Sequence, residues 1–143
     1  MATINPYLTF NGNAEEAFNF YKSVFGGEFM GEVNRFKDMP DSENLSHEDG
    51  RKVMHVALPI GNGTTLMASD TIESMGQPFN PGTNFTISIH PENEEEANRL
   101  FNGLSAGGQV TMPLEKTFWA ALFGMFTDKF GIQWMVNYEE SQQ

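Results

Sequence analysis

The 143-residue sequence contains no cysteine. Disulfides, thiol nucleophiles and cysteine-bound metals are therefore excluded. Lysine and arginine are also scarce, with 8 of them against 19 aspartates and glutamates, which gives a formal net charge of −11. Because binding to phosphate backbones and anionic lipids depends on clustered cations, we expect neither nucleic acid nor a membrane as a partner.

Long apolar runs are missing as well. No stretch approaches the roughly 18 apolar residues of a membrane-spanning helix, and the opening "MATINPYL" lacks the layout of a secretory signal. We therefore expect a cytoplasmic protein. Hydrophobic residues make up 39% of the sequence and include 13 Phe, so the chain can bury a core of its own.

The sequence does contain an internal repeat. Residues 13–29, "NAEEAFNFYKSVFGGEF", return 80 positions later in residues 93–110, "NEEEANRLFNGLSAGGQV". In both segments an Asn precedes a Glu by three positions, which is typical of a helix-capping box. A Gly pair near the end of each segment predicts the helix C-terminus, where glycine tolerates a left-handed backbone. Apolar residues have the i, i+3, i+4, i+7 spacing of an amphipathic helix, at 17, 20, 21 and 24 and at 97, 100, 101 and 104.

The repeat extends to the flanking segments and predicts a strand, a helix and three strands in each half. Alternation of apolar and polar residues is clearest at 84–90. We expect a single α+β domain over 1–143, with module one at 1–70, a Pro- and Gly-containing linker at 71–83 and module two at 84–143. The expected strands are 4–10, 28–36, 51–60, 64–70, 84–90, 109–115, 119–127 and 131–138, with a polar loop at 37–50.

Two copies of a β-α-β-β-β module resemble the vicinal oxygen chelate superfamily, which includes glyoxalase I, extradiol dioxygenases and bleomycin-resistance proteins. Within it, "NPYLTFNGNAEEAFNFY", "GGQVTMPLEKTFWA" and "FGMFTDKFGIQWMVN" resemble the PhnB-like branch. The resemblance covers essentially the whole chain. It implies a mixed sheet that curves around a cup, helices on the outside, and a homodimer. Some PhnB-like proteins are labelled demethylubiquinone methyltransferases, but this sequence has no strand–Gly-rich loop–helix unit for a nucleotide.

Metal-dependent members of the superfamily place one ligand on the first strand and one on the last strand of each module. By position these correspond to Pro6 and Met67 in the first half, and to Thr86 and Met135 in the second. None of the four offers an imidazole or a carboxylate, and divalent ions prefer N and O donors over thioethers. The resemblance therefore predicts a vacant metal position and no metal cofactor.

The same alternation of strand residues predicts which side chains line the cup. Val56 and Leu58 belong to the core face of their strand, which directs His55 toward the cup. His55 is either a strand histidine bonded to a neighbour or a ligand-orienting group or general base, because an imidazole can both donate and accept a proton. The expected ligand pocket consists of His55, Met67, Ser69, Thr86, Ser88, Trp119, Gln133 and Met135.

Two functions follow from this pocket. The first is a metal-independent protein that binds a small organic molecule in the cup. The second is an enzyme, a lyase, isomerase or oxygenase, with His55 as its catalytic residue. The enzyme would use acid–base chemistry or a divalent metal relocated to His55, His90 and either Asp70 or Asp128. A duplicated domain with a purely structural role is a third alternative.

Overall fold

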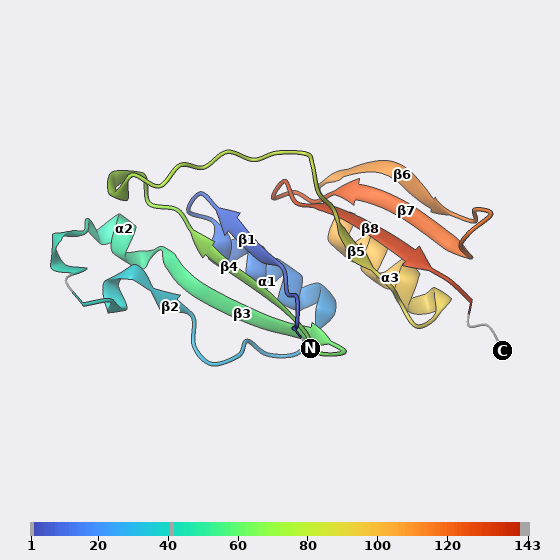
Figure 1. Ribbon diagram of the computed structural model, residues 1–143, viewed down its shortest axis with the longest axis horizontal. Coiled ribbons are helices and arrows are strands. Elements are labelled where there is room, and N and C mark those ends of the chain that lie inside the picture. Colours follow the sequence, from blue (N-terminus) through green and yellow to red (C-terminus); the bar gives the residue numbers. More distant parts are fainter. Residues whose placement is uncertain (1, 41, 141–143) are drawn as a thin grey trace. The chain divides into compact units, whose positions relative to one another are not determined.

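The computed structural model describes residues 2–40 and 42–140, which form two compact units (Figure 1). Residues 1, 41 and 141–143, which the predicted domain includes, lie outside the described part. The boundary between the units falls after Asn80, inside the predicted linker. In each unit the order is strand, helix and three strands. The α+β class and the duplicated β-α-β-β-β module are therefore confirmed, and the cup between modules stays a prediction.

The first unit is built on a four-stranded sheet with the order β1-β4-β3-β2. Strand β1 is parallel to β4, and β3 is antiparallel to both of its neighbours. The segment that was expected to be a plain loop contains the short helix α2 and two 3-10 turns. The elements are β1 (Tyr7–Phe10), α1 (Ala14–Phe25), β2 (Asn34–Arg35), η1 (Phe36–Asp38), η2 (Ser42–Asn44), α2 (His47–Arg51), β3 (Val53–Gly61), β4 (Thr64–Asp70) and η3 (Glu73–Met75).

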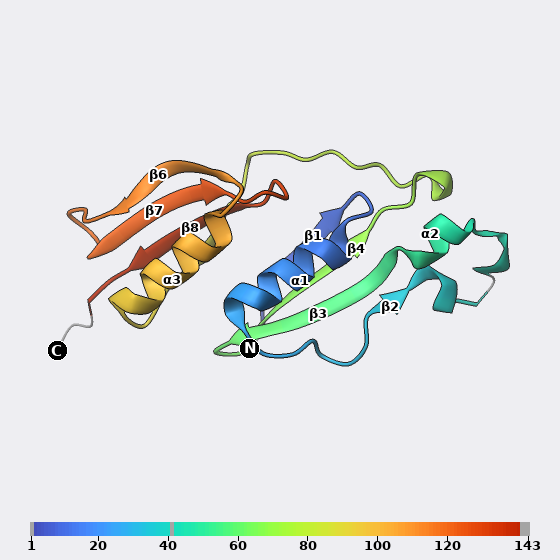
Figure 2. The same ribbon diagram turned by 180° about the vertical axis from the view of Figure 1, so that it is seen from behind.

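The second unit repeats this topology with the order β5-β8-β7-β6. The pairing is again parallel at the first strand and antiparallel elsewhere. Its elements are β5 (Ile87–Ile89), α3 (Glu94–Ser105), β6 (Gln109–Glu115), β7 (Leu122–Thr127) and β8 (Gln133–Tyr138). Figure 2 shows α1 and α3, each lying across one face of the sheet of its own unit.

Helix α3 has the predicted form. Its buried residues are Ala97, Leu100, Phe101 and Leu104, the stripe given by the spacing. The Asn93 side chain accepts a hydrogen bond from the Glu96 N–H at 2.8 Å, as expected of a cap. The periodic sequence therefore sets both the start of this helix and the face that it buries.

Helix α1 differs from its prediction in both respects. Ala17 and Tyr21 are buried as expected, but Ala14 and Phe18 complete the buried stripe instead of Phe20 and Val24. The Asn13 side chain makes no capping hydrogen bond. The carboxylate of Asp70, at the end of β4, accepts from the Ala14 N–H instead. A residue distant in sequence has replaced the local cap.

The predicted strand 28–36 is also wrong in extent, because only Asn34–Arg35 pairs as β2. Three glycines that precede it, Gly26, Gly27 and Gly31, have positive φ angles between 70° and 83°. A left-handed backbone cannot continue a pleated strand. This segment therefore reaches the sheet as an irregular connection.

The close approach of α3 to its sheet depends on Gly124 of β7. A Cβ atom at this position would lie 2.6 Å from Phe101 Cε2 and 3.0 Å from the Leu114 Cα. The Phe101 ring packs edge-to-face on Phe126, with ring centroids 5.1 Å apart. The missing side chain thus makes room for the Phe101 ring between α3 and the sheet.

We predict that Gly124→Ala lowers the free energy of unfolding by about 1–3 kcal/mol, because the added methyl group overpacks a filled core. Equilibrium unfolding in urea measures the change. Gly82→Ala is the matched control, since its Cβ would meet nothing closer than Asn84 Oδ1 at 3.7 Å. Equal stability of the two variants would contradict the assignment of a packing role to Gly124.

Candidate functional site

In the first unit, the sheet face opposite α1 carries the predicted pocket residues. On β4 the buried residues Leu66, Ala68 and Asp70 alternate with the partly exposed Met67 and Ser69. Met67 lies opposite both Tyr7 and Ala57 in the register, so these residues share the helix-free face.

His55 belongs to the same face, because it is two positions from Ala57 on β3. Its Nδ1 lies 3.4 Å from the Tyr7 hydroxyl oxygen, and the two rings are 5.9 Å apart. Tyr7 is 49% exposed. The predicted residues His55 and Met67 are therefore neighbours of Tyr7, and Ser69 lies on the same face opposite Thr9. Tyr7 was not among the predicted pocket residues, because Pro6 was assigned to this position.

In the second unit, the face opposite α3 carries the remaining predicted residues. Trp134 and Val136 of β8 are buried, whereas Gln133, Met135 and Asn137 alternate with them and are partly exposed. Ser88 of β5 lies opposite Met135. Thr86 precedes β5 by one residue and has the same parity as Ser88. The Gln133 amide donates to the Phe85 carbonyl at 2.6 Å.

Trp119 joins this face from a loop rather than from a strand. It was expected at the start of a strand, but β7 begins at Leu122. Its ring packs edge-to-face on Phe123 with ring centroids 5.3 Å apart and is 46% exposed. Phe123 lies opposite Asn137 in the register. The helix-free face of the second unit therefore combines aromatic rings, a methionine and uncharged polar groups.

In both units the strand register pairs the last-strand methionine with a residue other than the expected first-strand position, Pro6 or Thr86. Tyr7, not Pro6, lies opposite Met67, and Pro6 contributes its carbonyl oxygen to the Met67 N–H at 3.1 Å. In the second unit Ser88 lies opposite Met135. A phenol, a hydroxyl and two thioethers remain poor ligands for a divalent ion.

Asp70 and Asp128, proposed for a relocated metal site, have structural roles. Among residues 2–40 and 42–140, no three His, Asp or Glu side chains gather as a metal site would require. Both carboxylates are only 3% exposed. Asp128 Oδ1 accepts from the backbone N–H groups of Phe130 and Ile132, and its Oδ2 accepts from the Trp134 indole at 2.8 Å.

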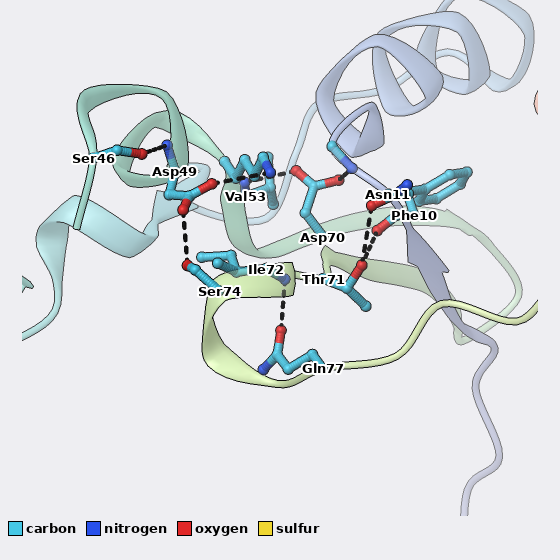
Figure 3. Close-up of polar contacts among 12 residues, drawn as sticks. Phe10, Asn11, Ser46, Asp49, Val53, Asp70, Thr71, Ile72, Ser74 and Gln77 are labelled. Atoms are coloured by element: carbon cyan, nitrogen blue, oxygen red, sulfur yellow. Dashed lines mark hydrogen bonds and ion pairs between the residues drawn. The ribbon is translucent and has the colours of Figure 1, made fainter.

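Asp70 joins three elements of the first unit (Figure 3). Its Oδ1 accepts from the N–H groups of Gly12 and Ala14 at 3.0 and 2.9 Å, and its Oδ2 accepts from the Val53 N–H at 2.8 Å. The carboxylate thus fixes the start of α1 and the start of β3 at the end of β4. A buried charge is tolerated here because backbone donors surround it.

A cavity of about 550 Å³ opens beside Asp70, and none of the sequence patterns predicted it. We call it the basic cavity, because four of the chain's eight Lys and Arg residues line it. Its residues come from four segments that are distant in sequence, so no local motif announces it. They are Asn11, Gly12, Glu15, Arg35, Lys37, Glu48, Arg51, Lys52, Val53 and Asp70.

One ion pair anchors the wall of the basic cavity. The Arg35 guanidinium donates to both Glu15 oxygens, at 3.1 and 2.7 Å, and also to the Arg51 carbonyl at 2.8 Å. The hydrogen bond from Arg35 lowers the pKa of the Glu15 carboxyl below its usual value, and the same contact raises the pKa of Arg35. Bidentate geometry of this kind fixes the orientation of a guanidinium.

A second set of contacts holds α2 in place. Asp49 accepts from Ser74 at 2.9 Å and pairs with Lys52 at 3.1 Å, and its N–H donates to Ser46 (Figure 3). The hydrogen bonds from Lys52 and then Ser74 lower the pKa of the Asp49 carboxyl. Helix α2 is therefore attached both to its own N-terminal turn and to η3.

Comparison with known proteins identifies the class. The model of the family described as 3-demethylubiquinone-9 3-methyltransferase matches residues 2–137. Solved structures of a glyoxalase-related enzyme and a glyoxalase/bleomycin resistance protein/dioxygenase family enzyme share the fold, at TM-scores of 0.62 and 0.59 and identities of 18% and 14%. The chain belongs to the family that this model describes, and a solved relative that is 27% identical is described as a PhnB protein, the branch that the motifs predicted.

Three relatives show how closely the chain follows this family. Protein YjdN of Escherichia coli is 34% identical, with 97% of each chain covered. The structure of protein PA1353 from Pseudomonas aeruginosa is 42% identical, covers 99% of this chain and 100% of its own, and has a TM-score of 0.85. A putative 3-demethylubiquinone-9 3-methyltransferase, PhnB protein, from Bacillus cereus is 27% identical over 96% and 99%, with a TM-score of 0.76.

We predict that Asp70→Asn lowers the free energy of unfolding by roughly 2–4 kcal/mol. The amide group replaces one accepting oxygen with a donor and leaves a buried backbone N–H without an acceptor. Urea unfolding measures the change. Asp38→Asn, which alters one exposed hydrogen bond to the Arg35 N–H, is the matched control and should cost less than about 1 kcal/mol. An Asp70→Asn protein as stable as the control would show that this carboxylate does not organise the unit.

Proposed function

We propose that this PhnB-like protein binds a small, uncharged organic molecule on the helix-free face of its second unit, without the metal typical of the superfamily. The observation that carries the proposal is Asn137. Its Oδ1 is buried and has no hydrogen-bond partner among residues 2–40 and 42–140. Buried polar atoms are almost always paired in folded proteins, so an unpaired one calls for a partner from outside.

The surroundings of Asn137 define the chemistry of that partner. Phe123 lies opposite Asn137, and Trp119 packs against Phe123. Met125 lies opposite Met135 on the same face. Aromatic rings offer flat apolar surfaces, and methionine adapts its shape to what it contacts. The proposed ligand is therefore planar and mainly apolar, with one N–H or O–H group that donates to Asn137.

A hydrogen bond to Glu139 sets the orientation of the Asn137 amide. Its nitrogen donates to Glu139 Oε1 at 3.5 Å, which selects the present orientation over the flipped one. If the amide were flipped, the buried atom would be an NH₂ group instead of an oxygen. The ligand would then accept a hydrogen bond at the same place, and the polar anchor would remain.

On the first unit, His55 and Tyr7 support a related role. On β1, β3 and β4, the residues of its helix-free face, among them Tyr7, His55, Met67 and Ser69, carry no carboxylate and no Lys or Arg. A histidine beside a phenol orients a polar group of a ligand or moves a proton, which is the chemistry of the alternative enzyme reading. The methyl transfer in the family's name is not proposed, because the sequence lacks a Gly-rich nucleotide-binding unit.

The proposed assembly and location come from the sequence alone. We propose a homodimer from the resemblance to the family, and we keep the cytoplasmic location as a proposal. None of the described helices is long and apolar enough to cross a membrane. Both statements stay predictions.

We predict that indole binds the second unit more tightly than 1-methylindole, by about three- to tenfold, because only indole has an N–H group to donate to Asn137. Nuclear magnetic resonance titration of isotope-labelled protein gives both affinities and maps the shifts, which should lie on β7 and β8. Asn137→Ala should remove the difference between the two compounds.

The control for this titration is Asn102→Ala, on the exposed side of α3, which should keep the difference. Shifts confined to α3, or equal affinities of the two compounds for the unaltered protein, would contradict the proposed site.

A further inference from the structure

The basic cavity of the first unit differs in charge from the rest of the molecule. The chain carries a net charge of −11, yet the cavity lining combines four cations, Arg35, Lys37, Arg51 and Lys52, with three acids, Glu15, Glu48 and Asp70. A local excess of positive charge within an acidic protein concentrates anions at that place. On the helix-free face of the second unit, by contrast, the charged residue opposite Phe123 is an acid, Glu115.

Most of the lining charges already have partners. Glu15 is bound by Arg35, Asp70 by three backbone N–H groups, and Lys52 by Asp49. Lys37 and Arg51 are exposed side chains that form no ion pair within the part of the chain that the structure describes. Two cations are therefore available to a ligand.

Packing of α2 brings these two cations to the same cavity. Gly50 of α2 is buried, and a Cβ atom there would lie 3.3 Å from the Lys37 Cβ. The Phe36 N–H donates to the Lys52 carbonyl at 3.1 Å, which joins η1 to the segment that follows α2. Arg35 is fixed between Glu15 and the Arg51 carbonyl. Backbone hydrogen bonds and packing contacts therefore hold η1, which carries Lys37, and α2, which carries Arg51, in defined positions.

We propose that the basic cavity is a second binding site, distinct from the helix-free faces, which binds the oxyanion group of a small polar molecule. Lys and Arg are the side chains that bind phosphate and carboxylate groups in proteins. The cavity volume of about 550 Å³ is in the range of small-molecule sites. Glu48, the remaining acid on the lining, accepts a hydrogen bond from a hydroxyl or ammonium group elsewhere on the same ligand.

The experiment measures binding of inorganic phosphate and of succinate to the full chain by calorimetry at low ionic strength, where charge interactions are least screened. Phosphate represents the phosphorylated class of ligand and succinate the carboxylated class. Lys37→Gln/Arg51→Gln should weaken binding of the preferred anion by about tenfold or more. Both substitutions are at exposed positions, and the urea midpoint should stay near that of the unaltered protein.

The matched control is Arg99→Gln/Lys116→Gln, which removes the same two charges from the second unit. It should change anion affinity by less than about twofold. Three results would contradict the proposal that the basic cavity is a binding site. Neither anion binds, or Lys37→Gln/Arg51→Gln binds the anion as tightly as the unaltered protein, or the control variant loses as much anion affinity as Lys37→Gln/Arg51→Gln. Indole binding should be the same in both double variants, so failure of this inference is distinguishable from failure of the site on the second unit.

Discussion

The buried carboxylate of Asp70 is the interaction on which the organisation of the first unit depends. It receives hydrogen bonds from Gly12, Ala14 and Val53, and thereby joins the end of β4 to the starts of α1 and β3. Removing water from a charge is costly, and three backbone donors offset that cost only when all three elements are in place. One residue therefore sets the position of the helix, and with it which sheet face is covered and which is free. The same residue forms part of the lining of the basic cavity.

This arrangement separates two kinds of chemistry within one small chain. The helix-free faces carry mainly uncharged polar groups, aromatic rings and methionines, with Glu115 opposite Phe123 in the second unit. Such a lining suits a mainly apolar ligand with a single polar group. The basic cavity carries arginines and lysines, which suit an anion. On these faces Tyr7 lies opposite Met67 within the first unit, and Ser88 lies opposite Met135 within the second. None of these four side chains is a ligand that a divalent ion prefers.

The sequence patterns predicted the structural features that depend on residues close to one another in the chain. Helix α3, with its Asn93 cap and its buried stripe, follows directly from the repeat, because both signals lie within one segment. The N-terminal cap of helix α1 does not follow from the repeat, because it comes from Asp70, more than 50 residues away. The parity of β3, β4 and β8 placed His55, Met67 and Gln133 on the helix-free faces. The first-strand positions Pro6 and Thr86 were assigned by their distance from the helices, whereas Tyr7 and Ser88 are the residues that lie opposite Met67 and Met135. The basic cavity was not predicted, because its cations meet only after α2 packs on η1.

The central claim is that binding on the helix-free faces proceeds without a bound divalent ion. Elemental analysis of untagged protein, purified without chelators, tests it most directly by measuring Mn, Fe, Co, Ni, Cu and Zn per chain. The account predicts that each metal is far below one per chain, in both the unaltered protein and His55→Ala. A single metal near one per chain that is lost on His55→Ala would contradict it, and would establish a metal site at the Tyr7–His55 pair.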